Sequence, residues 1–189
     1  EHQATVDGVT YKLDDPFFVI ATQNPIESLG TFPLPEAQLD RFLMKLSLGY
    51  PERSAEKEIL SQYNGKNPLN TLSAVCTKDD VKAASDAVCE ITVSEPIKEY
   101  ILNIAEATRN SEKLRLGISP RASLALMKAS QAYAGIMGRD FVLPDDVKSV
   151  AVPVLSHRIL VKTSNTIRLT DTGEKVIEDL INTVKAPVD

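Results

Sequence analysis

Three polar residues, Asn24, Arg41 and Arg121, stand where they could act on a phosphate group. Asn24 closely follows Phe17 to Thr22, an apolar and β-prone run that is typical of a strand buried on both faces of a sheet. Ligands bind at the carboxyl edge of a parallel sheet, so an amide there could hydrogen-bond a phosphate oxygen or a water. The alternative is an Asn24-Pro25 turn that only ends the strand.

Arg41 lies at the end of a short predicted helix, Glu36 to Phe42. An arginine at this place could reach across a subunit boundary to a phosphate. It could instead complement the negative end of the helix dipole. A third possibility is an ordinary ion pair with Asp40 or Glu36.

Arg121 lies in the first turn of a helix that Ser119 and Pro120 are expected to open. The helix dipole places partial positive charge at this end, so a cation there is mildly unfavourable. This placement tilts the interpretation of Arg121 towards anion binding, and a purely structural role is the alternative.

The motifs of a complete catalytic site are missing from the sequence. A phosphate-binding loop needs Gly-x-x-x-x-Gly-Lys-Ser/Thr. The pair Gly65-Lys66 has Leu60 where the first glycine should stand and Asn67 after the lysine. No strand pattern ends in the paired acids that would hold Mg²⁺ and polarise water. As a stand-alone enzyme the chain is therefore expected to be incomplete and inactive.

Composition narrows the class of protein. The 189 residues are 43% hydrophobic and 25% charged, which is typical of a globular protein. With 21 Lys+Arg against 26 Asp+Glu, the net charge of -5 disfavours a broad basic face for nucleic acid. No apolar run approaches the roughly 20 residues that span a bilayer. We expect a cytoplasmic protein.

Cysteine and histidine are too sparse for a metal site. Cys76 and Cys89 are far apart, as are His2 and His157, and no Cys-x-x-Cys pair exists. A structural zinc site and a His-dependent triad are both disfavoured, and no metal ligands are predicted. Each cysteine is expected to be a buried thiol.

The expected elements divide the chain into an α/β part and a helical part. Residues 3–13 predict a hairpin turning at Asp7-Gly8, followed by the strand 17–22, the helix 36–42 and a strand over 43–48. We place the boundary near Pro51, giving an α/β part, 1–51, and a helical part, 52–189. The helical patterns cover 52–63, then begin near 77, 94, 119, 145 and 171, with a short β element over 163–169.

Several sequence blocks together resemble the MoxR family of AAA+ ATPases. The blocks are FFVIATQNPIE from Phe17, GTFPLPEAQLDRF from Gly30, SPRASLAL from Ser119, and GRDFVLPDDV from Gly138 continuing into PVLSHR from Pro153. They occur in the family's order and cover roughly residues 3 to 160. The resemblance implies the end of an AAA+ P-loop α/β core followed by a helical lid.

The resemblance also implies a role for each polar residue. Asn24 is similar to sensor 1, which positions the attacking water. Arg41 is similar to the arginine finger, which reaches the γ-phosphate of ATP on the neighbouring protomer. Arg121 is similar to sensor 2, in its own subunit or the next. Residues 3–13 are similar to the pre-sensor-1 hairpin.

By the same resemblance, Walker A and Walker B lie upstream of Glu1. The intact protein is then expected to bind ATP with Mg²⁺ in a ring, as a hexamer, and to remodel or mature partner proteins as a chaperone does. Proteins with von Willebrand factor A domains are expected partners. The alternatives are a non-catalytic helical adaptor derived from an AAA+ lid, and a related AAA+ ring such as a magnesium-chelatase subunit.

Overall fold

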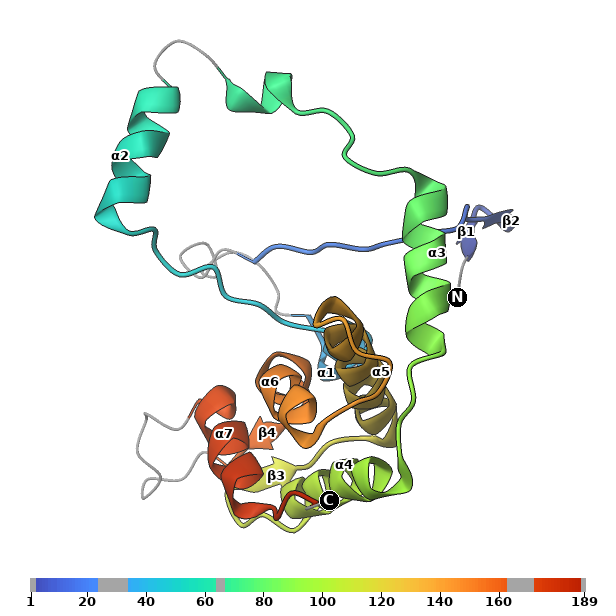
Figure 1. Ribbon diagram of the computed structural model, residues 1–189, viewed down its shortest axis with the longest axis vertical. Coiled ribbons are helices and arrows are strands. Elements are labelled where there is room, and N and C mark those ends of the chain that lie inside the picture. Colours follow the sequence, from blue (N-terminus) through green and yellow to red (C-terminus); the bar gives the residue numbers. More distant parts are fainter. Residues whose placement is uncertain (1–2, 24–33, 64–66, 163–171, 188–189) are drawn as a thin grey trace. The chain divides into compact units, whose positions relative to one another are not determined.

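The computed structural model describes residues 3–23, 34–63, 67–162 and 172–187 (Figure 1). The chain forms two compact units, which we describe separately. The first unit contains residues 1–20 and 46–85, and the second contains 21–45 and 86–189. This grouping follows compactness and does not coincide with the boundary near Pro51, which remains a prediction. Asn24 lies outside the described residues.

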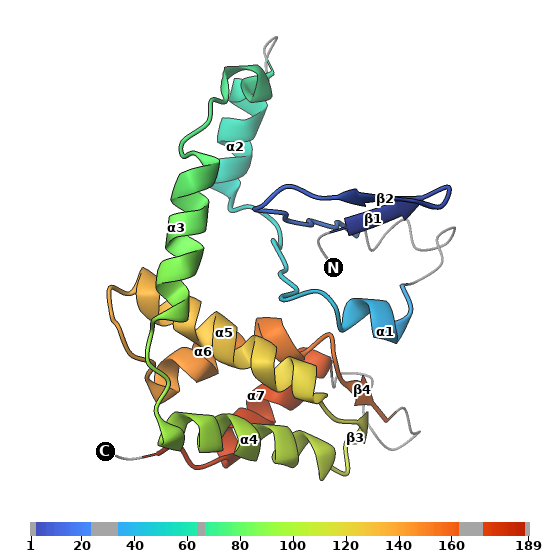
Figure 2. The same cartoon turned by 90° about the vertical axis from the view of Figure 1, so that its right-hand side faces the viewer.

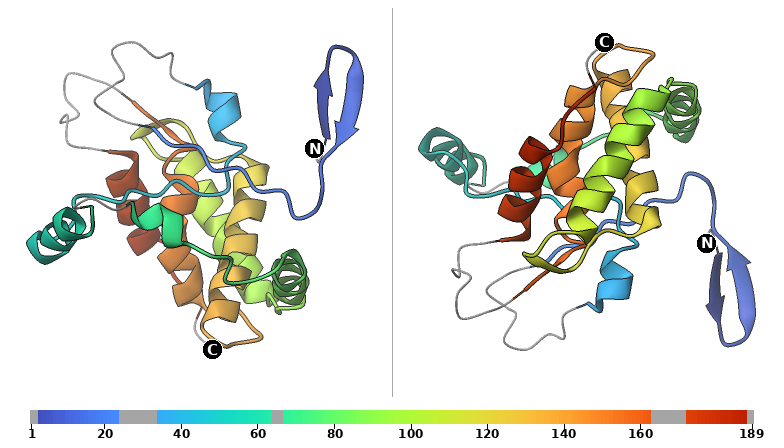
Figure 3. Two further views of the ribbon diagram at one scale, coloured as in Figure 1. Left: turned by 90° about the horizontal axis from the view of Figure 1, so that it is seen from above. Right: turned by 90° about the horizontal axis from the view of Figure 1, so that it is seen from below.

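The first unit begins with the predicted hairpin. Strands β1 (Gln3–Val6) and β2 (Val9–Lys12) pair antiparallel, with Val6 opposite Val9, and lie side by side in Figure 3. Asp7 and Gly8 both have positive φ, 51° and 80°, as a two-residue turn of this hand requires. The Asp-Gly signal is therefore confirmed.

Three short helices complete the first unit: α2 (Arg53–Gln62), the 3₁₀ helix η2 (Pro68–Thr71) and α3 (Lys78–Cys89), whose last turn belongs to the second unit. A capping box between Thr77 and Asp80 opens α3. The N–H and hydroxyl of Thr77 donate to Asp80 Oδ2 at 2.8 and 2.7 Å, and Asp80 N–H donates back to Thr77 Oγ1 at 3.2 Å.

The two strands predicted after the hairpin, one from an apolar run and one from alternation, are wrong for the described structure. Residues 17–22 and 43–48 form no strand, and Phe18 and Ile20 are 82% and 79% exposed. A buried strand needs a hydrogen-bonded neighbour on each side, and the described residues provide none to these segments. The apolar pattern indicates only that the segment tends to be buried. It does not indicate whether neighbouring strands are present to pair with it.

The second unit is a helical bundle. Helices α4 (Glu95–Arg109), α5 (Pro120–Ile136), α6 (Pro144–Leu155) and α7 (Gly173–Thr183) surround one apolar core (Figures 1 and 2). The apolar residues of α4 that recur at helical spacing are all buried, as expected for an amphipathic helix: Ile97, Ile101, Ile104 and Ala105. The largest buried apolar side chains include Tyr100, Ile104, Leu126, Val147, Val154 and Ile177.

A short ribbon fixes the approach to α5. Strands β3 (Leu114–Leu116) and β4 (Leu160–Val161) pair antiparallel. Next, a Cβ on Gly117 would lie 2.7 Å from Arg109 Cα, so only glycine fits against the end of α4. Ile118 N–H then donates to Thr108 Oγ1 at 3.1 Å, and Arg109 Nε donates to Ile118 O at 3.1 Å.

Helix ends in the second unit differ in detail from expectation. Helix α6 contains Pro153 and continues to Leu155, because a proline near the last turn removes only one hydrogen bond. The cap of α7 is Thr172, whose hydroxyl accepts from Lys175 N–H at 3.4 Å. Asp171, the expected cap, lies outside the described residues, as does the predicted β element 163–169.

Two further observations concern whole-chain expectations. Cys76 and Cys89 are both exposed, so the prediction of buried thiols is wrong; each lies beside an end of the solvent-facing helix α3. Among the helices described, none combines the length and apolar character needed to cross a membrane.

Candidate functional site

Arg41 sits in the tight turn that ends α1 (Glu36–Leu39), a helix with no buried residue. Its N–H donates to Gln38 O at 3.2 Å, and Phe42 N–H donates to Leu39 O at 3.1 Å. We call residues 40–42 the Arg41 turn. A one-turn helix has little stability of its own, so contacts from elsewhere must fix the direction of this turn.

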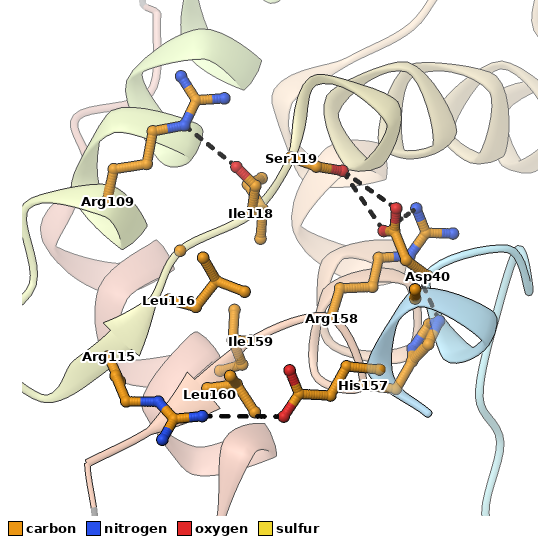
Figure 4. Close-up of a pocket in the computed structure, with 13 residues that line it drawn as sticks. Asp40, Arg109, Arg115, Leu116, Ile118, Ser119, His157, Arg158, Ile159 and Leu160 are labelled. Carbon is orange, nitrogen blue, oxygen red and sulfur yellow. Dashed lines mark hydrogen bonds and ion pairs between the residues drawn. The ribbon is translucent and has the colours of Figure 1, made fainter. Parts of the chain in front are cut away.

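Arg158 supplies contacts on both sides of Arg41. Its Nη1 lies 3.5 Å from Asp40 Oδ1, the residue before Arg41. Its Nη2 donates to the carbonyl of Phe42, the residue after Arg41, and lies 3.4 Å from Leu43 O. Figure 4 shows the guanidinium of Arg158 and the carboxylate of Asp40 directed toward one another.

Ser119 connects the same carboxylate to α5. Its hydroxyl lies 3.3 and 3.4 Å from the two carboxylate oxygens of Asp40, to which it donates (Figure 4). The same oxygen accepts from Ala122 N–H at 3.3 Å and so caps the helix. Arg121 lies in the turn that this cap begins. The expected Ser-Pro helix start is confirmed.

His157 is held neutral beside this ion pair. Burial is the largest effect and lowers the pKa of His157 below its ordinary value, and the positive charges of Arg158 and Lys45 lower it further. The hydrogen bond to Phe42 O and the negative charge of Asp40 act in the opposite direction and raise the pKa, but they do not outweigh the lowering. Its Nε2 lies 3.1 Å from Phe42 O and 3.3 Å from Arg158 Nε. The nitrogen can donate to the first or accept from the second, according to the tautomer.

Two cavities adjoin the network. The larger, about 660 Å³, lies between α1, the β3 loop and residues 157–160, and Figure 4 shows its lining. The smaller, about 180 Å³, is lined by residues that include Arg41, Arg121, Lys128 and Arg158. The fold therefore brings Arg41 and Arg121, far apart in sequence, to one cavity that other cations and the carboxylate of Asp40 also line. Such a cavity can bind a phosphate group.

Sequence reasoning missed three residues of this site. Lys128 is seven residues after Arg121 and so shares its face of α5, a spacing that could have indicated it. Asp40 was considered only as a partner of Arg41, and it pairs with Arg158. Arg158 lay inside a sequence block noted for its resemblance, yet nothing local could indicate its contact with a turn so distant in sequence.

Two family models match this chain. One, described as ATPase family associated with various cellular activities (AAA), matches residues 1–44, and the other, described as AAA lid domain, matches residues 106–180. A crystal structure of a Cytophaga hutchinsonii protein, provisionally described as an ATPase, has a TM-score of 0.88 at 34% identity. The match covers 99% of this chain and 59% of the Cytophaga hutchinsonii chain. The helical bundle and the segment before it therefore define the lid and part of the core of an AAA ATPase.

The similar proteins narrow the family. The uncharacterized protein YeaC of Bacillus subtilis is 45% identical over all of this chain and 58% of its own length. Chaperone MoxR1 of Mycobacterium tuberculosis is 37% identical over 99% of this chain and 51% of itself. Protein MoxR of Paracoccus denitrificans is 31% identical over 75% of this chain and 47% of its own length. The chain belongs to the MoxR family of AAA+ ATPases and spans about half the length of these relatives.

The family implies ATP and Mg²⁺, and the described residues fit only the first. The cations around the smaller cavity suit phosphate oxygens, with Arg41 and Arg121 able to contact them. No cluster of three or more His, Cys, Asp or Glu side chains suited to a metal ion occurs in the described ranges. No step involving Mg²⁺ is therefore assigned to this chain.

Proposed function

We propose that this chain is the sensing and lid part of an ATPase that works as a ring and remodels partner proteins. The observation that carries the proposal is the shared cavity of Arg41 and Arg121. Arg41 would stabilise the charge that develops on the transferred phosphoryl group, and Arg121 would link the position of α5 to the same phosphates. Asn24 would position the attacking water.

The shared cavity also bears on which subunit's ATP the two arginines contact. A finger arginine contacts the nucleotide of the next subunit, where it can be worth a factor of about 10³ to 10⁵ in rate. If Arg41 does so, a phosphate in the smaller cavity lies beside Arg121 as well. We therefore propose that both arginines act on the neighbour's ATP, within an assembly that is a hexamer.

The biological output would be chaperone-like. The relative MoxR1 is named a chaperone, and we extend that role to this chain. A ring whose lids move with nucleotide state can transmit force to a bound protein. Proteins with von Willebrand factor A domains are the proposed partners, in the cytoplasm. Nucleic acid is disfavoured by the net charge of -5.

The test is Arg41→Ala in the full-length gene product, measured for ATP binding and for turnover. We expect nucleotide affinity to change less than about threefold and kcat to fall about 10³-fold, because the finger acts on the transition state. Arg53→Ala, on the exposed helix α2, is the matched control and should leave both unchanged. Equal losses of binding and turnover would contradict the finger role. A wild-type protein that neither binds nor hydrolyses ATP would favour the adaptor alternative.

A further inference from the structure

We propose that Arg158 is a positioning residue for Arg41, which clamps the Arg41 turn on both sides and makes it move together with α5. The inference rests on the proposed function, in which Arg41 contacts a phosphate of the neighbouring subunit. It assigns the orientation of that arginine to a residue of the lid.

The first argument is that the Arg41 turn is joined by several contacts to the end of α6 and the residues that follow it. Helix α1 is four residues long and buries none of them. Leu43 and Met44, which follow the turn, are exposed, and Lys45 N–H donates to Pro153 O at 2.8 Å, again on the α6 segment. The path of the main chain through residues 40–45 is therefore tied to the end of α6 and the residues that follow it.

The second argument is the shape of the clamp. A guanidinium presents several N–H donors in one plane and can bind two acceptors at once. Arg158 uses this fork on the Asp40 carboxylate and the Phe42 carbonyl, which flank Arg41 on the chain. Its side chain is only 2% exposed, and its N–H is anchored to Leu155 O at 3.0 Å. Because both flanks of Arg41 are held by one rigid group, the turn cannot rotate independently.

The third argument is the link to the helix that carries Arg121. Ser119 donates to Asp40 and, through the same oxygen, caps α5. A continuous set of hydrogen bonds therefore runs from the end of α6 through Arg158 and Asp40 to the start of α5. A shift of α5 that follows nucleotide state would be transmitted to the residue next to Arg41.

The experiment compares variants of the full-length protein by steady-state ATPase kinetics, nucleotide affinity and melting temperature. Arg158→Lys keeps the charge opposite Asp40 but lacks the planar fork that holds the Asp40 carboxylate and the Phe42 carbonyl from fixed positions. The control is Arg139→Lys, which weakens another arginine–aspartate pair of the same bundle, with Asp146, away from the Arg41 turn. Asp40→Asn is a second variant that disturbs the clamp with little change in volume, should Arg158→Lys fail to fold.

We expect Arg158→Lys to lower kcat by roughly 10- to 100-fold, since small misplacements of a catalytic group have costs of this order. Nucleotide affinity should stay within about twofold, and Arg139→Lys should lower the melting temperature without lowering kcat. The double variant with Arg41→Ala should be no slower than Arg41→Ala alone, because residues that act as a unit are not additive.

The outcomes separate this inference from the proposed function. If Arg41→Ala lowers kcat while Arg158→Lys and Asp40→Asn do not, the clamp is wrong and the finger stands. If the losses from Arg41→Ala and Arg158→Lys multiply, Arg158 acts through stability or at another place, and the inference is again overturned. If Arg41→Ala leaves kcat unchanged, the proposed function is wrong, and this inference, which rests on it, is wrong as well.

Discussion

Asp146 is almost fully buried at the start of α6 and is paired with Arg139 through two hydrogen bonds, one of them 2.7 Å from Nη1 to Oδ2. Its carboxylate also accepts from Leu143 N–H at 2.7 Å. Burial alone would raise the pKa of Asp146, but the hydrogen bonds from Arg139 and Leu143 outweigh it and the pKa lies below its usual value. One carboxylate thus serves as an ion-pair partner and as a helix cap.

Asp146→Ala should destabilise the bundle by about 2 kcal/mol, below the roughly 3–5 kcal/mol found for fully buried pairs, because Arg139 stays partly in water. Unfolding in urea, followed by circular dichroism, measures the loss. Asp145→Ala on the same turn is the control, since its side chain is 85% exposed in an ion pair with Lys148. Asp145→Ala should lower the free energy of unfolding much less than Asp146→Ala does. Equal losses for both variants would contradict the assigned role of Asp146.

His157 should make stability depend on pH near neutrality. Its pKa in the folded protein lies below the ordinary value of 6.5, so the unfolded chain binds a proton first. The stability that neutral His157 provides is complete above pH 6.5 and is lost as pH falls from there through the folded pKa. The imidazolium would face Arg158 and Lys45, with Asp40 as the opposing charge.

The measurement is the melting temperature between pH 7.5 and 5.5, which should fall with pH in the wild type. His157→Gln can still hydrogen-bond and does not titrate, so its decline should be shallower. A wild-type curve that is flat, or that rises on acidification, would contradict this account.

Gly117→Ala should destabilise the β3–α5 connection. The new Cβ would lie 2.7 Å from both Arg109 Cα and Arg109 N, and main-chain atoms cannot rotate away. We expect a loss of about 1–3 kcal/mol, as for other overpacked sites. Leu116→Ala, on a neighbouring side chain that is 52% exposed, is the control for substitution in this loop. Hydrogen exchange at Ile118 N–H gives a local readout, since its bond to Thr108 should open first.

Local features of this fold could be predicted from the sequence. The Asp7-Gly8 turn and the Thr77–Asp80 box depend on neighbouring residues alone, and the buried face of α4 follows from helical periodicity. The segment 17–22 could not be predicted correctly, because a strand forms there only if neighbouring strands pair with it, and its own residues do not show whether they do.

The candidate site divides in the same way. The types and positions of Arg41 and Arg121 indicated phosphate chemistry, but only the folded bundle brings them to one cavity. Arg158 had no local signal, because its acceptors Asp40 and Phe42 lie in a distant part of the chain. Roles that depend on contacts between distant segments require the structure.

The last prediction tests whether Arg41 and Arg121 of one subunit act at the same ATP site or at different ATP sites. Full-length Arg41→Ala and Arg121→Ala proteins are each purified, mixed in equal amounts and allowed to exchange subunits. If Arg41 acts across the interface and Arg121 within its own subunit, about a quarter of the sites in a random ring recover both residues. If both act on the neighbour, as the shared cavity supports, every site lacks one of the two and activity stays at the level of the unmixed variants. Energy transfer between wild-type subunits that carry different fluorescent labels, measured after mixing, confirms that subunits exchange. Recovery toward a quarter of wild-type ATPase would show that the two arginines of one subunit serve different ATP sites, and would overturn the proposal that both act on the neighbour's ATP.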